Sequence, residues 1–151
     1  MPNLLPDRVD PYGSYKFYIE WNGIVHAGFK SCSGLSVSQD IGSYREGHDP
    51  LTSRKLPGVL TYENIALERG ITYNAELWEW HEKLAQGKSE RREVSIVLQD
   101  DTGTEQIRWN LTKCWISSWS GPSFDAMASD TALESVELAH EGIVKYEAKK
   151  P

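Results

Sequence analysis

An alternation of apolar and polar residues dominates the start of the chain. Every second residue from Tyr15 to Trp21 is aromatic or aliphatic. Successive side chains of a strand point to opposite faces, so this alternation predicts a half-buried strand. The Asn22-Gly23 dipeptide that follows tolerates the positive φ angles of a type I′ turn, which predicts a hairpin with residues 24–29 as the returning strand.

Two more alternating segments, residues 35–46 and 60–69, flank a polar stretch. Each is expected to be a strand with one apolar face, and residues 47–58 between them are expected to form a long polar loop. The apolar residues expected to face the core of the subunit are Val37, Ile41, Ile65 and Leu67, with Leu35 on the same face as Val37. The opposite faces carry small or charged residues, namely Ser36, Ser38, Asp40, Asn64 and Glu68.

Only residues 75–86 show the spacing of a helix. Leu77, Trp80, His81 and Leu84 fall at positions i, i+3, i+4 and i+7, which places them on one face. We expect the helix to begin after an N-cap at Asn74 and to end at a C-terminal cap supplied by Gly87.

The second half of the chain returns to strand patterns. Residues 92–99 are expected to form a strand with Val94, Ile96 and Leu98 inward. A turn at 100–103 leads to further strands at 105–111, 113–119 and 133–146, with a loop at 120–129. This order predicts a mainly β fold, an antiparallel β-barrel or β-sandwich with one α-helix plugging one end. We divide the chain into an N-terminal arm at 1–13, a β-barrel domain at 14–147 and a C-terminal tail at 148–151.

Composition narrows the function. The 151 residues, 39% of them hydrophobic, fit one globular domain, and the formal charge of −6 argues against specific binding of nucleic acid. No apolar run approaches the ~20 residues that span a bilayer, and the start lacks a signal-peptide pattern, so we expect cytoplasmic synthesis and no membrane insertion by the monomer. Six Trp and seven Tyr against three Phe are typical either of a surface that becomes buried on assembly or of a β-rich core filled by aromatic rings.

Catalytic patterns are missing. His81-Glu82 would begin a zinc protease motif, but Ala85 stands where the second histidine is required. The histidines show no ligand spacing, and we expect Cys32 and Cys114 to be buried thiols. A thiolate pair of either cysteine with His140 is a weak alternative. We therefore predict no catalytic residue, no cofactor and no metal site.

Several short segments, taken together, resemble one protein family. They occur in order over about residues 11–146 and are Tyr44-Arg45-Glu46-Gly47, Arg54-Lys55-Leu56-Pro57-Gly58, Leu67-Glu68-Arg69-Gly70, Leu77-Trp78-Glu79-Trp80, Arg91-Arg92-Glu93-Val94-Ser95-Ile96-Val97-Leu98 and Glu137-Leu138-Ala139-His140-Glu141-Gly142. This pattern is similar to that of the inner tube proteins of contractile phage tails and contractile injection systems, the tail-tube and Hcp-like proteins.

The resemblance implies a subunit that closes into a homo-hexameric ring, with rings stacked into a hollow tube inside a contractile sheath. The implied partners are the sheath protein, the baseplate or spike, tube-terminating proteins and a cargo in the lumen, either effector protein or DNA. The residues that would face the lumen are Ser36, Ser38, Asp40, Asn64 and Glu68. Those that would form subunit and ring-stacking interfaces are Tyr44, Arg45, Glu46, Asp49, Arg54, Lys55 and Leu56.

The sequence is also compatible with two other kinds of protein. A monomeric β-sandwich that binds carbohydrate or protein through its Trp-rich surface would show the same strand patterns, and a hydrolase using cysteine or histidine ranks behind it. The sequence leaves undecided whether the particle is a phage tail or an injection system, which cargo and target cell it serves, and how charge is distributed along the lumen.

Overall fold

The computed structural model describes residues 10–22, 24–26, 28–44, 47, 54–88 and 90–147. Within them the fold is mainly β with one helix and antiparallel strand pairing, which confirms the predicted fold class. The elements are β1 (Phe17–Trp21), β2 (Ile24–His26), β3 (Phe29–Ser33), β4 (Val37–Tyr44), β5 (Arg54–Tyr62), β6 (Ile65–Gly70), α1 (Glu76–Ala85), β7 (Arg92–Gln99), β8 (Glu105–Ser120), β9 (Leu133–Ala139) and β10 (Gly142–Glu147).

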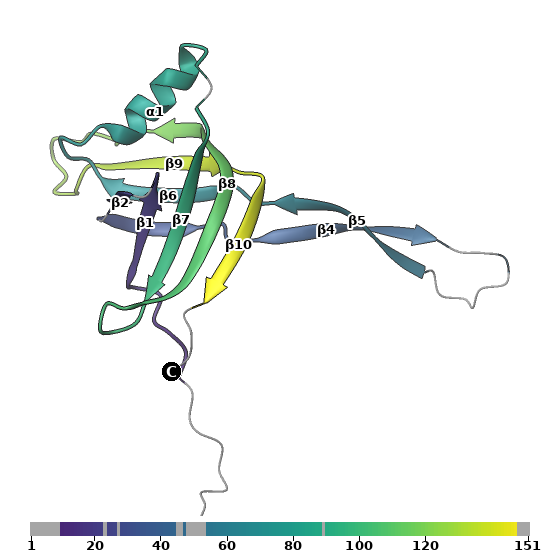
Figure 1. Ribbon diagram of the computed structural model, residues 1–151. Helices are drawn as coiled ribbons and strands as arrows, with labels where there is room; N and C mark the ends of the chain where they lie inside the picture. Colours follow the sequence, from purple (N-terminus) through teal and green to yellow (C-terminus); the bar gives the residue numbers. More distant parts are fainter. Residues whose placement is uncertain are drawn as a thin grey trace, which may run out of the picture.

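Eight strands form one curved sheet in the order β2-β1-β7-β8-β9-β6-β3, with β10 paired to β8 (Figure 1). The 16-residue strand β8 joins two halves of this sheet. One half contains β2, β1, β7 and β10, and the other contains β9, β6 and β3. Its first half pairs with β7 and β10, and its second half pairs with β9. Lys113, with a φ of 52°, interrupts the regular backbone between the two halves. The sequence patterns at 105–111 and 113–119 are therefore one strand with an irregular residue, rather than two strands.

The core lies between the two halves of the sheet and under α1. Ile19 and Trp21 from β1 are buried in one cluster with Ile65 and Leu67 from β6 and with residues of β7, β8 and β9. The helix adds Trp80, whose ring lies 6.4 Å from that of Trp21. The predicted helical plug over one end of the fold is thus confirmed.

The two ends of α1 form in different ways. Gly87, with a φ of 83°, follows the C-cap residue Gln86, and its N–H donates to the Leu84 carbonyl while Lys88 N–H donates to Lys83. These two bonds are the Schellman pattern, which satisfies the last helical carbonyls and confirms the predicted stop. The predicted N-cap was wrong by one residue: Ala75 holds that position, and the Asn74 side chain accepts from Glu76 N–H at 3.0 Å beside it.

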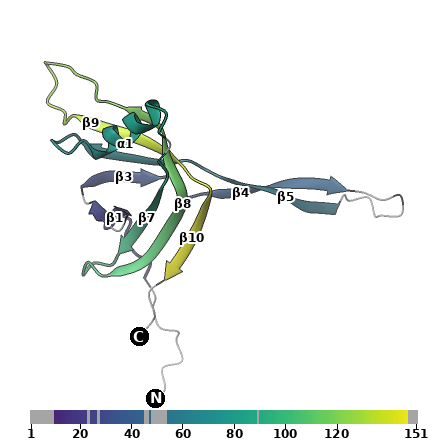
Figure 2. The ribbon, with the colours of Figure 1, turned by 45° about the horizontal axis from the view of Figure 1, so that its top comes forward.

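Among the described strands, β4 and β5 pair only with each other, and they project from the rest of the fold, as Figures 1 and 2 show from two directions. We call this hairpin the arm; it is distinct from the N-terminal segment at 1–13. Two predictions were wrong here. Residues 54–58, expected in a loop, belong to β5, because they pair with β4 as far as Tyr44. Val37 and Ile41, expected in the core, are 51% and 67% exposed, because no described segment of the chain packs over the arm as a second layer.

Other strand boundaries shift at corners. The predicted strand 60–69 is divided at residues 63–64, where Glu63 N–H donates to the Ser36 carbonyl. The predicted strand 133–146 is divided at residues 140–141, where Glu141 N–H donates to the Thr112 carbonyl. The returning strand 24–29 ends early, at His26. By contrast, the strand at 92–99 and the turn at 100–103 lie where the sequence predicted them.

Candidate functional site

One outer surface of the sheet is made of small or acidic side chains, most of them serines. Four strands, β3, β6, β9 and β8, contribute to it, and their register aligns the residues in two rows. Paired residues of neighbouring strands lie on the same face. The first row is Ser31, Glu68, Ser135 and Ser120, and the second is Ser33, Ala66, Glu137 and Ser118. We call these eight residues the serine face.

Alternation explains why this surface is polar. The residues between those of the serine face, such as Leu67, Val136 and Leu138, point inward and are at most 2% exposed. None of the eight side chains is large and apolar, and the charged ones are Glu68 and Glu137. Lys30, the residue at the bulge of β3, lies 3.6 Å from Glu68 through its ammonium. The surface is therefore smooth, hydrophilic and weakly acidic.

Sequence reasoning missed most of the serine face. Only Glu68 was among the residues expected to face a lumen. In the segments 31–33, 118–120 and 135–137, polar residues stand two positions apart, as on one face of a strand. Only the register between the strands shows that these residues meet on one face of the sheet. The other expected lumen residues, Ser36, Ser38, Asp40 and Asn64, are exposed on or beside the base of the arm.

The same four-stranded region has two edges available for pairing. Among the described strands, β3 pairs with β6 alone, and residues 115–120 of β8 pair with β9 alone. Strand edges carry backbone N–H and C=O groups that can pair with another chain. The serine face can therefore be extended on both sides by copies of the same sheet.

Both faces of the arm carry exposed apolar side chains. On one, cross-strand pairing brings together Val37 with Tyr62, Gln39 with Leu60, and Ile41 with Pro57. On the other, Ser38 pairs with Thr61, and Asp40 lies against Gly58. This second face also carries Tyr44 and Leu56, which are about half exposed.

The expected interface residues fall on the outer part of the arm. Tyr44 pairs with Arg54, while Lys55 and Leu56 lie opposite Ser43 and Gly42. These side chains are exposed, and half of the Leu56 side chain is accessible. Arg45, Glu46 and Asp49 lie outside the described residues.

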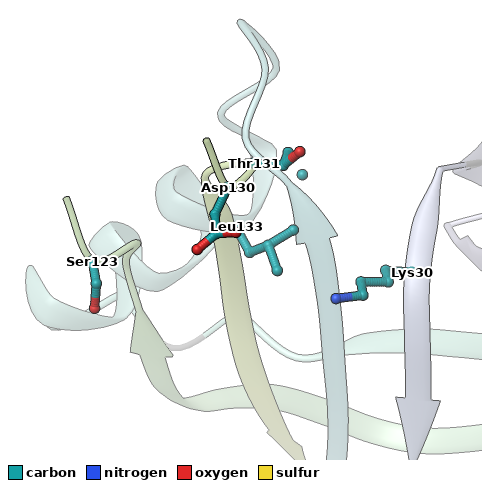
Figure 3. A pocket seen from close by; sticks show the side chains of 6 residues that line it. Lys30, Ser123, Asp130, Thr131 and Leu133 are labelled. Carbon is teal, nitrogen blue, oxygen red and sulfur yellow. The ribbon is translucent and has the colours of Figure 1, made fainter. Parts of the chain in front are cut away.

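A cavity of about 580 Å³ lies between the edge of the sheet and the loop that precedes β9 (Figure 3). Lys30 reaches toward it from β3, and Asp130, Thr131 and Ser123 line the other side. Among the residues that the structure describes, there is no group of three histidine, cysteine, aspartate or glutamate side chains that could hold a metal ion.

The cysteines and histidine of the weak hydrolase alternative are in unreactive settings. Burial raises the pKa of Cys32 to about 11 and that of Cys114 to about 12, whereas a nucleophilic thiol needs a lowered pKa. Cys114 is buried as predicted, and Cys32 is only partly so. His140 directs its Nε2 at the Glu63 carbonyl, 3.0 Å away, and its Nδ1 lies 3.3 Å from the Gly142 carbonyl.

No helix in the described part of the chain is both long and apolar enough to cross a membrane.

Solved structures with the same fold include chains of an extracellular contractile injection system. The chain is 28% identical to a chain of an extracellular contractile injection system, the PVC sheath-tube complex in its extended state, with a TM-score of 0.83 over 91% of this chain and 93% of that one. It is 26% identical to a chain of the anti-feeding prophage (AFP) tube terminating cap, with a TM-score of 0.86 over 95% of both chains. Hcp1 from Flavobacterium johnsoniae, at 17% identity and a TM-score of 0.55 over 87% of this chain and 95% of that one, shares the fold.

The family assignment comes from the sequence as a whole. No curated protein matches the chain by sequence. Residues 13–144, however, match the T4-like virus tail tube protein gp19 family, which covers both the serine face and the arm. The predicted resemblance is confirmed, and the free binding module is not favoured. The chain belongs to the tail tube protein family and is a structural subunit of an inner tube.

Proposed function

We propose that six copies close into a ring and that the rings stack into a tube whose lumen is lined by the serine face. The observation that carries this proposal is the alignment of eight small or acidic residues across four strands whose two edges are open. Pairing each edge with the opposite edge of the next copy would remove both edges, as closure does in a barrel. Ser36, Ser38, Asp40 and Asn64 extend this lining toward the arm.

The tube acts mechanically, without catalysis or a cofactor. Contraction of a surrounding sheath would drive it through a target envelope, and cargo would pass through the lumen. The sheath, baseplate or spike and tube-terminating cap are the partners we propose, because PVC and AFP chains similar to this one come from a sheath-tube complex and a tube terminating cap. The finished tube is part of a phage tail or tail-like particle.

The chemistry of the lining suits transport. Serine hydroxyls offer water both a donor and acceptors but no apolar patch on which cargo could adhere. Glu68 and Glu137 add negative charge that repels nucleic acid phosphates, so DNA could pass without sticking, and a folded effector protein would meet a hydrated wall. Each ring would carry six times the formal charge of −6 per chain.

Electron microscopy and thiol labelling test the proposal. Ser118, an exposed member of the serine face, is replaced by cysteine (Ser118→Cys) in a protein whose partly exposed thiol has been removed by Cys32→Ser. The purified protein is treated with a maleimide on a polymer too bulky for the lumen. We expect ring-shaped end views in electron micrographs. The bulky reagent should label the introduced cysteine only after the tube dissociates, whereas a small maleimide should label it both in the tube and in the dissociated protein. A monomer in light scattering, or equal labelling by the bulky reagent before and after dissociation, would contradict the proposal.

A further inference from the structure

The arm joins the rest of the fold through a narrow neck, which is formed by residues 34–36 and 63–64. The two segments run close together there. A Cβ added to Gly34 would collide with the Asn64 carbonyl oxygen, and Gly34 has a φ of 101°, so glycine is required at this position. Glu63 N–H donates to the Ser36 carbonyl at 3.1 Å and closes the neck. The arm beyond it is roughly 25 Å long, so a small rotation at the neck becomes a large displacement at the outer end.

His140, at the corner between β9 and β10, contacts this neck. Its ring centroid lies 5.5 Å from that of Tyr62, the last residue of β5. Its Nε2 lies 3.0 Å from the Glu63 carbonyl oxygen, and its Nδ1 lies 3.3 Å from the Gly142 carbonyl oxygen. One ring nitrogen therefore faces the arm and the other faces the corner that holds the histidine, so hydrogen bonds from this ring can fix the angle between the arm and the sheet.

A neutral imidazole cannot bind both carbonyl oxygens. A carbonyl only accepts hydrogen bonds, and the neutral ring carries one N–H, whereas the protonated ring carries two. When the single proton is on Nε2, the lone pair of Nδ1 faces the Gly142 carbonyl; when it is on Nδ1, the bond to Glu63 is lost. Protonation of the ring provides both bonds together. The link between the corner and the arm is therefore complete only in the protonated state.

The charged groups of the elements around the ring are compatible with a cation there. Glu63, whose carbonyl the ring faces, carries one carboxylate, and Glu141, the next residue of the corner, carries another. Arg91 from the start of β7 and Lys113 from β8 both bind Glu141, at 2.9 and 3.5 Å, and balance its charge. On the arm side, the aromatic ring of Tyr62 is a favourable neighbour for a cation at this distance.

We propose that His140 is a positioning residue that holds the arm at a fixed angle to the sheet, and that protonation of its imidazole tightens this hold. In the protonated ring both carbonyls are bound. In the neutral ring the neck loses one hydrogen bond for part of the time, and the arm moves over a wider range of angles. The inference concerns the single subunit and does not depend on the closure of a ring.

Spin labels on the arm and on the sheet measure this angle. In full-length protein that carries Cys32→Ser, the labels are attached at Lys55→Cys in β5 and at Ser118→Cys in β8, while the native Cys114 is fully buried. Double electron–electron resonance on the dissociated subunit gives the distribution of distances between the labels at about pH 5 and about pH 8, on either side of the usual titration of histidine. We expect a narrow distribution in acid and a broader one in base.

Hydrogen exchange at the neck gives a second measurement. The Glu63 amide, which donates to Ser36, should open roughly three- to tenfold more often at the higher pH, after correction for the intrinsic effect of pH on exchange, because one hydrogen bond at the neck is lost. The pH midpoint of this change should coincide with the midpoint at which the His140 ring signals titrate in nuclear magnetic resonance spectra of the wild type. Two different midpoints would overturn the proposal.

Two substitutions separate protonation from packing. His140→Gln keeps a donor that does not titrate, so its distance distribution and its exchange rates should be the same at both pH values. His81→Gln, the matched control, removes a histidine of α1 and should leave the pH response intact. The proposal is wrong if the labelled protein with His140 shows no pH response, or if His140→Gln retains it. If His140→Gln does not fold, the comparison of midpoints in the wild type decides. None of these results depends on whether rings form, so the proposed tube is tested separately.

Discussion

Arg69 and Glu134 form a buried ion pair beneath the serine face, with 2.6 Å between Nε of the arginine and Oε1 of the glutamate. Both side chains are less than a tenth exposed. Two further polar atoms of the pair have partners: Arg69 Nη2 donates to the Asn74 carbonyl at 3.1 Å, and Trp119 Nε1 donates to Glu134 Oε2 at 3.1 Å. The network joins β6, β8, β9 and the turn before α1, so it fixes the strands whose outer side forms the serine face.

We expect Glu134→Ala to destabilise the dissociated subunit strongly. The change leaves the Arg69 guanidinium buried without its carboxylate, and breaking a buried pair in this way costs ~3–5 kcal/mol. Urea unfolding of the wild type and the variant measures the difference. Glu137→Ala, three residues along β9 but on the exposed side, is the control and should change stability by no more than ~0.5 kcal/mol. Equal effects of the two substitutions would show that the buried pair does not stabilise the fold.

Deleting residues 52–56 should prevent tube formation while leaving the subunit folded. The deletion removes the first described residues of β5, including Lys55 and Leu56, but the core residues of the sheet and helix lie elsewhere. We expect isolated rings or monomers in electron micrographs and an unchanged far-ultraviolet circular dichroism spectrum apart from the shortened hairpin. Tubes of normal length would show that the outer part of the arm is dispensable for assembly.

The turn at 100–103 should give a pH-dependent contribution to stability. Hydrogen bonds from the Thr102 hydroxyl and from the backbone N–H of Thr104, among others, lower the pKa of Asp100 from 3.8 to about 2. A lowered folded-state pKa stabilises the fold above the unfolded value and loses that effect as pH falls through the folded value. Asp100→Asn should therefore be less stable than the wild type at neutral pH, with a gap that shrinks below pH 3.8 and closes near pH 2.

Thermal unfolding of both proteins across this pH range, in the dissociated state, measures the gap. A difference that stays constant from neutral pH to pH 2 would mean that the shape of the side chain, and not its charge, supports the turn.

Local signals in the sequence predicted much of the fold. Alternation identified the strand at 92–99, helical spacing placed Leu77 and Trp80 in the core, and Gly87 marked the end of the helix, because each of these features depends only on residues near one another in the chain. The family was also predictable, since its motifs extend over most of the chain.

The serine face and the exposure of the arm depended on the tertiary structure. Ser31 and Ser120 lie in one row only because β6 and β9 stand between them in a particular register, and a shift of one residue would turn either side chain inward. Likewise, alternation assigns Val37 and Ile41 to one face of a strand, but it contains no information on whether another layer covers that face. The sequence alone determined which side chains share a surface within each strand, and the packing of distant strands decided which of those surfaces are buried, because burial depends on contacts between residues far apart in the chain.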